Sequence, residues 1–395
     1  VTFLVSGSFT RDIVGEGTVN DVLSLANGAS LSTGVALTEI EDLTIATGGT
    51  VTIQNTHHAG FTGAITAAGT ETLHVDGGGS LSTLANIENY VLDSDSGWGT
   101  LTVANNANNI SIDATALGTT TFAVNANAET NNVVTLTMDS DTLYNELGAY
   151  ALTGGQGSSD VLIFDGALDA TSVSAADMGG VTGFETLKFT DGYSSVINLA
   201  DINNGSTQLT IDASLLTTSR ASVNGQLDTN GTFVFVGGTQ NDVFVGGAGD
   251  DTFTGGAGAD YLSGQAGANT FIYTATTQST STSIDEIISF NVGVSASVID
   301  LSGIAGITEA ELDSGGGYTF DSTVHSDLAT ALGDATFITN NLTTAGDITS
   351  FVTGDSKRYL VIESGDAAGY DSGNDIVFET SASLTGFVDA NILGA

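Results

Sequence analysis

The sequence contains no cysteine and no proline, and only five of its 395 residues are basic. Without cysteine the chain has no disulfides and no thiolate metal ligands. The scarcity of basic residues leaves no positive patch for nucleic acid or for an anionic membrane, so neither is expected as a partner. No apolar run approaches the roughly 20 residues that a membrane-spanning helix needs, so membrane insertion is not expected either.

Acidic residues dominate the charge, since 46 Asp and Glu give a formal net charge of −41. Most of these carboxylates have no salt-bridge partner, and a compact chain would repel itself unless another species neutralised it. Disorder is one outcome of such a charge. Disordered acidic chains are poor in apolar residues, however, whereas 41% of this chain is hydrophobic. We therefore expect a folded protein that binds divalent cations.

A nine-residue unit recurs in strict register from residue 237. The four copies read GGTQNDVFV, GGAGDDTFT, GGAGADYLS and GQAGANTFI, at 237–245, 246–254, 255–263 and 264–272. They resemble the RTX (repeats-in-toxin) nonapeptide G-G-x-G-x-D-x-U-x, where U is a large apolar residue. The last copy has Gln265 and Asn269 in place of a Gly and the Asp. A weaker unit, DTNGTFVFV at 228–236, has Phe233 at the Asp position.

The resemblance implies a parallel β-roll in which a six-residue turn precedes a three-residue strand. Ca²⁺ takes six to eight oxygen ligands, more than one turn supplies, so two stacked turns would share an ion. Successive units fall on opposite sides of the roll. Asp242 is therefore expected to pair with Asp260, and Asp251 with Asn269 in a weaker site whose second ligand is neutral. The predicted calcium-site residues are Gly237, Asp242, Gly246, Gly247, Gly249, Asp251, Gly255, Gly256, Gly258, Asp260 and Asn269.

The apolar U positions argue against a flexible Gly-rich linker, the simplest alternative for this segment. A linker would not place an apolar residue at every ninth position five times. These residues predict one apolar column between the turns, formed by Phe235, Phe244, Phe253, Leu262 and Phe271.

Downstream of the roll, the sequence predicts a β-rich cap. Residues 284–302 resemble the two strands that follow RTX arrays in type I-secreted proteins, and the tail at 384–395 resembles an uncleaved type I secretion signal. A last hairpin is expected from strands at 359–363 and 375–378. In its loop, Asp366, Asp371 and Asp375 are either a further ion site or, as we expect, solvated acids. Capping signals at Thr308 with Glu311 and at Ser326 predict two short helices, and a third is expected over 141–150.

The first 227 residues carry a different repeat. An apolar residue, a Glu, one further residue and then alternating apolar positions recur at 40–45, 87–92 and 184–189, with a looser copy at 71–75. Such alternation between turn residues predicts strands, in either a solenoid or a sandwich. The pattern resembles the β-rich, solenoid-like portions of RTX-type surface-layer proteins.

Motifs of the enzymes that carry RTX repeats are missing. The sequence has no H-E-x-x-H zinc-protease motif and no G-x-S-x-G nucleophile elbow. The adjacent His57 and His58 would point to opposite faces of a strand, so we interpret them as loop residues rather than metal ligands. We therefore expect a protein that is not an enzyme.

Together these features predict an all-β protein with three regions: a β-rich, solenoid-like region at 1–227, a calcium-binding parallel β-roll at 228–275, and a β-rich cap with a secretion signal at 276–395. The expected function is that of a secreted, calcium-dependent structural protein that self-assembles into a bacterial surface layer or an extracellular filament. Its partners would be copies of itself, with cell-surface polysaccharide as a second candidate. The alternative is an adhesin or a carbohydrate-binding module of a larger RTX surface protein. The apolar run at 1–5 is a candidate for the contact between subunits, unless it pairs within its own domain.

Overall fold

The computed structural model is all-β, which confirms the fold class that the sequence predicts. The chain forms two compact units: Val1–Ala170 with Ala176–Thr190 (unit 1), and Thr171–Ala175 with Asp191–Ala395 (unit 2). Among the described residues, no helix is long and apolar enough to cross a membrane. The structure describes residues 2–11, 13–15, 21–31, 35–46, 49–54, 65–66, 72–76, 79–82, 87, 89–92, 98–103, 110–114, 123–125, 134–139, 152–154, 160–165, 172–173, 177–191, 196–201, 208–291, 296–304, 318–320, 328–333, 348–354, 356–362, 370, 375–380 and 392–393.

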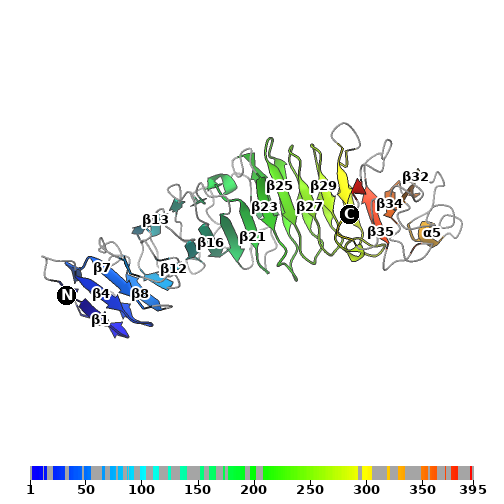
Figure 1. The fold of residues 1–395 in the computed structure, drawn as a ribbon. Helices are drawn as coiled ribbons and strands as arrows, with labels where there is room; N and C mark the ends of the chain where they lie inside the picture. The colour runs from blue at the N-terminus through cyan, green and yellow to red at the C-terminus, as the bar shows by residue number, and fades with distance from the viewer. Residues whose placement is uncertain are drawn as a thin grey trace. The chain divides into compact units, whose positions relative to one another are not determined.

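Unit 1 is a β-solenoid whose strands stack in parallel from one coil to the next (Figure 1). Parallel stacking decides for the solenoid over the sandwich, because a sandwich is built from antiparallel strands. The first sheet consists of β1 (Thr2–Val5), β4 (Val22–Leu25), β7 (Asp42–Ile45) and β9 (Ile65–Thr66). The second contains β2 (Ser8–Phe9), β5 (Ser30–Leu31), β8 (Thr50–Gln54), β10 (Thr72–Asp76), β12 (Asn89–Leu92), β14 (Ile110–Asp113), β16 (Val134–Asp139), β18 (Val161–Asp165) and β21 (Thr186–Phe189).

Two smaller sheets complete the coils of unit 1. One pairs β3 (Ile13–Val14) with β6 (Leu37–Thr38). The other contains β11 (Gly79–Ser82), β13 (Trp98–Thr102), β15 (Ala123–Asn125), β17 (Leu152–Thr153) and β20 (Val181–Thr182), and a short 3-10 helix, η3 (Asp177–Gly180), precedes β20.

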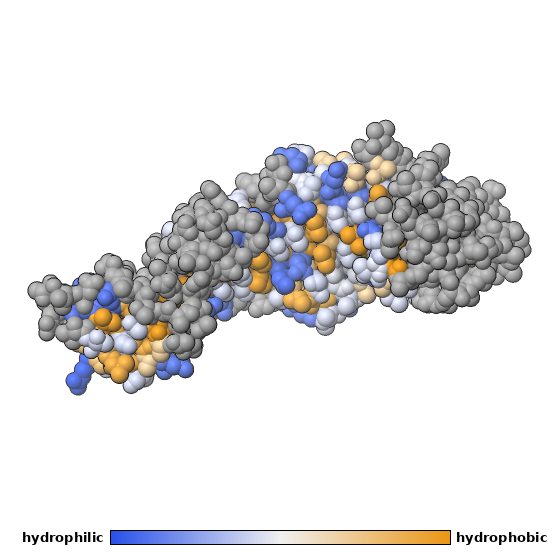
Figure 2. All heavy atoms as spheres, in the orientation of Figure 1, coloured by the Kyte–Doolittle hydropathy of each residue, from blue (hydrophilic) through white to orange (hydrophobic). Residues whose placement is uncertain are grey.

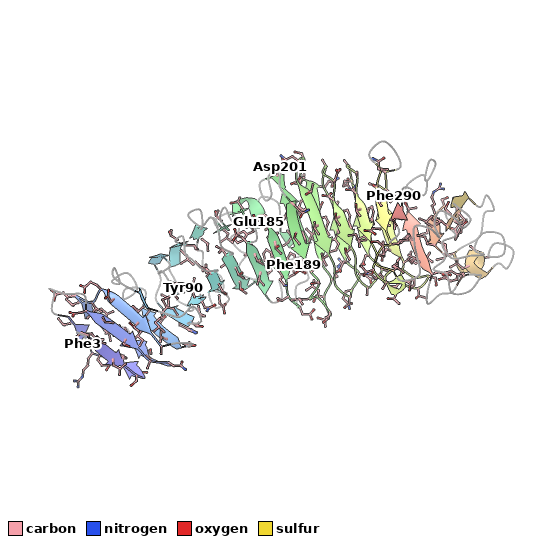
Figure 3. All side chains as sticks on the ribbon, viewed as in Figure 1. Phe3, Tyr90, Glu185, Phe189, Asp201 and Phe290 are labelled. Atoms are coloured by element: carbon pink, nitrogen blue, oxygen red, sulfur yellow. The ribbon has the colours of Figure 1, made fainter. Side chains whose placement is uncertain are left out.

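The recurring glutamate phrase marks strand starts in unit 1. β7, β12 and β21 each begin at the third residue of a copy of the phrase, and their residues alternate between half-buried and buried. The buried positions face the inside of the solenoid, as period-2 alternation requires. Tyr90 of β12, labelled in Figure 3, is one such residue and is fully buried.

In unit 2 the nonapeptides form a β-roll of two parallel sheets (Figure 1). Each nine-residue repeat contributes the short strand that its sequence predicts, and successive repeats alternate between the two sheets. One sheet carries β23 (Gln208–Asp212), β25 (Thr232–Val236), β27 (Thr252–Thr254) and β29 (Thr270–Ile272). The other carries β19 (Ser172–Val173), β22 (Val196–Ala200), β24 (Ser222–Leu227), β26 (Val243–Val245) and β28 (Tyr261–Ser263).

The core of the roll consists of two facing ladders of apolar residues, not the one column that the sequence suggested. Phe235, Phe253 and Phe271 stack along one sheet with ring centroids 5.0 and 5.1 Å apart. Phe244 and Leu262 line the other sheet, and the ring of Phe244 lies 5.0 Å from that of Phe235. Successive strands alternate between the two sheets. The apolar residues of neighbouring repeats therefore face each other across the core, and those of repeats two apart stack within one sheet. All five side chains are fully buried.

The two strands predicted within 284–302 are present as β30 (Asp285–Ile288) and β31 (Val298–Asp300). They do not pair with each other. Instead β30 stacks on β28 and β31 on β29, so they extend the two sheets of the roll by one further coil. β36 (Ile392–Leu393), which lies in the predicted secretion-signal tail, stacks on β31. The short 3-10 helix η4 (Thr276–Gln278) lies in the connection between β29 and β30.

The predicted last hairpin is confirmed: β34 (Arg358–Ile362) and β35 (Ile376–Thr380) pair in antiparallel fashion. β33 (Ile348–Val352) adds an antiparallel strand on the other side of β34. β32 (Tyr318–Phe320) pairs in parallel with β33. The helix expected after Ser326 is confirmed as α5 (Leu328–Gly333). The helices expected over 141–150 and from Thr308 with Glu311 lie outside the described residues.

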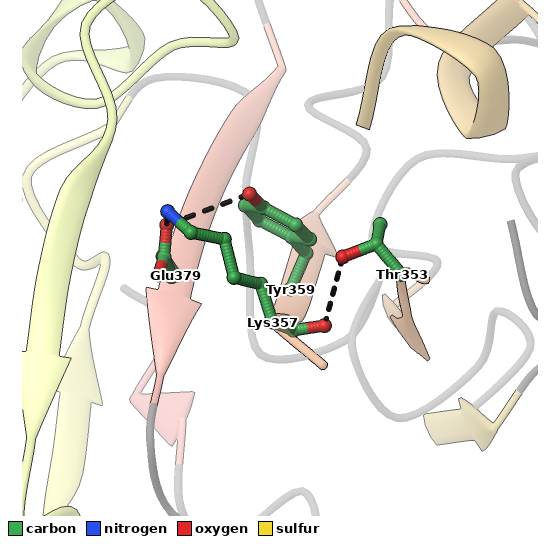
Figure 4. Close-up of polar contacts among 4 residues, drawn as sticks. All are labelled: Thr353, Lys357, Tyr359 and Glu379. Atoms are coloured by element: carbon green, nitrogen blue, oxygen red, sulfur yellow. Dashed lines mark hydrogen bonds and ion pairs between the residues drawn. The ribbon is translucent and has the colours of Figure 1, made fainter. Parts of the chain in front are cut away.

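One of the few basic residues forms an ion pair beside these antiparallel strands (Figure 4). Lys357 Nζ lies 2.7 Å from Glu379 Oε2, and the Tyr359 hydroxyl donates to the same oxygen at 3.4 Å. The Thr353 hydroxyl donates to the carbonyl of Lys357 at 3.2 Å. The Lys357 side chain is 48% exposed, so the ion pair adds at most about 1 kcal/mol. Burial raises the pKa of Glu286 on β30, and the charge of Lys357 opposes that rise.

Candidate calcium sites

The repeat aspartates on one side of the roll form a ladder. Each carboxylate precedes a strand and accepts a hydrogen bond from a backbone amide one coil earlier. Asp242 Oδ1 accepts from Ala221 N at 2.6 Å, and Asp260 Oδ1 accepts from Asp242 N at 2.7 Å. Asp285 Oδ1 accepts from Asp260 N at 2.9 Å and continues the ladder beyond the repeats. The structure thus brings Asp242 and Asp260 together, as the sequence predicts.

The second side repeats the arrangement with different residues. Asp251 Oδ1 accepts from Phe233 N at 2.7 Å, and Asn269 Oδ1 accepts from Asp251 N at 2.8 Å. The Ser297 hydroxyl oxygen then accepts from Asn269 N at 3.4 Å. The predicted neighbours Asp251 and Asn269 therefore also meet.

The second carboxylate oxygens differ in their partners. Asp242 Oδ2 accepts from Gly238 N at 2.7 Å, and Asp251 Oδ2 accepts from Gly247 N at 2.9 Å. Asp260 Oδ2 is buried and accepts no hydrogen bond from the described residues. A buried carboxylate oxygen without a partner is costly, and a bound cation would relieve that cost.

The turn glycines are required by close approach of oxygen atoms. At Gly256 and Gly258 the backbone is also left-handed, with φ of +95° and +129°, which favours glycine. A Cβ would lie within 3 Å of a carbonyl or carboxylate oxygen at each predicted glycine: Gly237, Gly246, Gly247, Gly249, Gly255, Gly256 and Gly258.

The turn of the last repeat is satisfied by its own side chain. Asn269 Nδ2 donates to the carbonyls of Gly264 and Ala266 at 2.8 and 3.0 Å. Gln265, where the motif has glycine, adopts a left-handed φ of 53°. The side-chain NH2 group of Asn269 thus donates within its turn, whereas the side-chain Oδ2 of Asp242 and Asp251 accepts. This turn is the one least in need of a cation.

Burial makes the repeat carboxylates poor anions on their own. It raises the pKa of Asp242 to about 6 and the pKa of Asp251 and Asp260 to about 7, and backbone amides offset only part of the rise. The charge of Asp242 also raises the pKa of Asp260. The charge of Arg220 lowers the pKa of Asp242 and so also opposes the effect of burial. These carboxylates therefore lie in an environment that a divalent cation would stabilise.

Ca²⁺ fits the donor set of these turns, which consists of carbonyl and carboxylate oxygens. Among the described residues, no group of three or more His, Cys, Asp or Glu side chains gathers. An ion between two turns would thus take most of its ligands from the backbone, with Asp242 and Asp260 on one side and Asp251 on the other. Bound Ca²⁺ would neutralise these carboxylates and hold successive turns together.

The comparison with protein families agrees with this chemistry. Residues 236–271 match the family model of the RTX calcium-binding nonapeptide repeat, in 4 copies. The chain therefore carries calcium-binding repeats of the RTX type, and Ca²⁺ is their cofactor. RTX repeat proteins are typically secreted. Comparison of the chain with curated proteins gives no match.

Carboxylates at strand starts in unit 1 make the same hydrogen bond as the repeat aspartates. Glu185 Oε2 accepts from Asp160 N at 2.7 Å, and Asp160 Oδ1 accepts from Val134 N at 2.7 Å. Glu41 Oε2 accepts from Asp21 N at 3.1 Å. Glu185 is labelled in Figure 3 at the start of β21. In two copies of the recurring phrase, the glutamates Glu41 and Glu185 thus bond each coil to the preceding one.

Asp285 is a site residue that the sequence did not single out. It is fully buried, and the Tyr273 hydroxyl donates to its Oδ2 at 2.8 Å. Burial, with the charge of Asp260, raises the pKa of Asp285 well above its usual range. Its signal in the sequence is an aspartate at the start of a short strand with an apolar residue two positions later, as in the motif, where Asp260 is followed by Leu262.

Three acids of the last hairpin were expected to be solvated. Asp375 is fully buried at the start of β35, so that expectation is wrong for this residue, because the β-strand it precedes is covered on both faces. Asp366 and Asp371 lie outside the described residues, as do His57 and His58.

Proposed function

We propose that the protein is a secreted structural protein that Ca²⁺ folds outside the cell, and that it assembles with copies of itself into a bacterial surface layer or an extracellular filament. Where Ca²⁺ is scarce, the acidic roll would repel itself and remain unfolded. Millimolar external Ca²⁺ would then supply binding free energy that becomes folding free energy. The role is structural rather than catalytic, and the absence of the protease and lipase motifs supports it.

The observation that carries the assembly proposal is the edge of strand β1. β1 pairs with β4 and is the last strand of its sheet, so no strand of the described residues covers its other edge. Leu4 on this strand is 76% exposed, and Val14 on β3, which also lies at the end of its sheet, is 57% exposed. The alternative, that the run at 1–5 pairs within its own domain, holds at one edge of β1, where this strand pairs with β4. An open edge with exposed apolar side chains favours pairing with another chain.

The surface of the same coils supports a contact of this kind. The face of the amino-terminal coils in Figure 2 shows apolar side chains among polar ones. A contact between this edge and a different surface of a second copy would propagate into an open array unless the array closed into a ring. Because every copy is strongly acidic, Ca²⁺ would be needed again to reduce repulsion between copies. Cell-surface polysaccharide is the proposed second partner, as an anchor.

An edge-blocking substitution tests the proposal. A lysine on an open edge opposes strand pairing, so Leu4→Lys should prevent ordered polymers in millimolar Ca²⁺, as seen by sizing and electron microscopy. Leu227→Lys, at a position 61% exposed in unit 2, is the matched control and should assemble normally. Deletion of residues 1–9 should have the same effect as Leu4→Lys.

Two results would overturn the proposal in different ways. If both amino-terminal variants assemble like the native protein, the β1 edge is not an assembly element. If the native protein stays monomeric at high concentration in Ca²⁺, self-assembly itself is wrong. The adhesin or carbohydrate-binding alternative would then replace it.

A further inference from the structure

The turn that precedes the first motif repeat departs from the motif at its key position. Phe233 stands where the repeats have Asp, and its side chain is fully buried in the apolar core. Its backbone amide still donates to Asp251 Oδ1, so the turn at 228–233 stacks beneath the turn at 246–251 as a repeat would. By the motif alone, this lower turn contributes no carboxylate.

The structure places a different carboxylate in this turn. Asp228, at the first position of the unit, is 1% exposed. Its Oδ1 accepts from Asn230 N at 3.1 Å and from Gly231 N at 2.7 Å. Its Oδ2 is buried and accepts no hydrogen bond from the described residues. A turn-capping role accounts for Oδ1 and leaves Oδ2 unexplained, and a buried charged oxygen without a partner points to a cation.

Asp228 and Asp251 lie on either side of Gly247. A Cβ on Gly247 would be 3.1 Å from the Cβ of Asp228, while Gly247 N donates to Asp251 Oδ2 at 2.9 Å. Two buried carboxylates that approach the same residue repel each other unless a cation lies between them.

Backbone oxygens of the lower turn approach the same place. The Gly231 carbonyl faces Gly249 so closely that no Cβ would fit there. The Asp228 carbonyl accepts from Ala248 N at 3.1 Å, so this carbonyl also lies against the upper turn. Carboxylate and carbonyl oxygens from two stacked turns are the ligand type that Ca²⁺ takes, in a number that one turn does not provide.

We propose that Asp228 and Asp251 hold an additional calcium ion between the turns at 228–233 and 246–251, at the amino-terminal end of the roll. The sixth position of this turn is Phe233 and has no carboxylate. Asp228, at the first position of the turn, supplies a carboxylate instead. The site lies at the boundary of the family match at 236–271, and Asp228 is outside that match. It does not depend on the assembly proposal, because it concerns the folded subunit alone.

Counting bound ions tests the site. Native mass spectrometry and calorimetry on the full chain with Ca²⁺ should show one ion fewer in Asp228→Asn than in the native protein. The asparagine keeps an oxygen for Asn230 N and Gly231 N, so the turn should still form. Asp250→Asn is the matched control, because it removes one charge from the exposed face of the upper turn and should leave the count unchanged.

A second variant guards against a folding defect. Asp228→Ser keeps one short oxygen to cap the turn and should also lose one ion while the β signal of the roll in Ca²⁺ stays native. The proposal is overturned if either folded variant of Asp228 binds as many ions as the native protein. It is also overturned if Asp250→Asn loses the same ion, since the effect would then come from general charge.

Discussion

Replacing Phe253 by alanine should destabilise the roll strongly. The side chain is fully buried, and its ring stacks between those of Phe235 and Phe271 at 5.0 and 5.1 Å. Truncating a buried phenylalanine to alanine costs about 3–5 kcal/mol, because it removes apolar burial and leaves a cavity. The ring lies in the middle of a ladder of fully buried, stacked side chains, so we expect a cost within that range.

Native-state hydrogen exchange is the suitable assay, because the chain has two units and a global unfolding curve would mix them. In saturating Ca²⁺, amides of residues 237–272 should lose protection that corresponds to about 3–5 kcal/mol of opening free energy. Leu227→Ala, at a position 61% exposed, is the control and should cost less than about 0.5 kcal/mol. A cost for Phe253→Ala as small as that of the control would refute the ladder.

Three further predictions concern the calcium turns. Asp251→Ala and Asp260→Ala should each weaken Ca²⁺ binding by calorimetry more than Asn269→Ala, because they remove a charged oxygen; equal affinities would mean that the register is wrong. Asn269→Asp should raise thermal stability in Ca²⁺, because it exchanges an amide that satisfies its own turn for a charged ligand; a variant no more stable in Ca²⁺ than the native protein would count against a site there. Burial raises the pKa of Asp251 and Asp260 to about 7, so the calcium-free native roll holds more protons than the unfolded chain between about pH 4 and 7. Its melting temperature in EGTA should therefore fall as the pH rises through that window, while Ca²⁺ affinity rises, and the opposite slopes would contradict the burial of these groups.

Most of the roll could be predicted from the sequence, because a nine-residue period fixes both the turn and the strand. It also fixes which side chains stack, as the hydrogen bond from Asp242 N to Asp260 Oδ1 shows. The number of apolar ladders was wrong for a physical reason. The alternation of successive repeats between the two sides of the roll is expected from the sequence. The period alone does not show whether the apolar side chains form one column or two facing ladders, so the facing of Phe235 and Phe244 needed the structure.

The features that the sequence did not predict depend on how many residues each coil contains, and a local sequence pattern does not show this number. In unit 1, alternating residues bury one face equally well in a solenoid or a sandwich, so only the parallel stacking of strands such as β10 and β12 decides. Asp285 follows an irregular connection after the last repeat, so its place on the Asp260 ladder is set by how much chain that connection takes up. Asp228 stands at a position where the motif has Gly, and the stacking of its turn against Gly247 brings it towards Asp251.

Far-ultraviolet circular dichroism through a cycle of calcium removal and return tests calcium-dependent folding most directly. In EGTA at neutral pH we expect the β signal to fall, because at least residues 237–272 unfold when their buried carboxylates lose the cation. The signal should return with Ca²⁺ and not with equimolar Mg²⁺, which requires near-octahedral geometry and dehydrates reluctantly. A spectrum that EGTA leaves unchanged, or that Mg²⁺ restores as well as Ca²⁺ does, would contradict calcium-dependent folding of the roll.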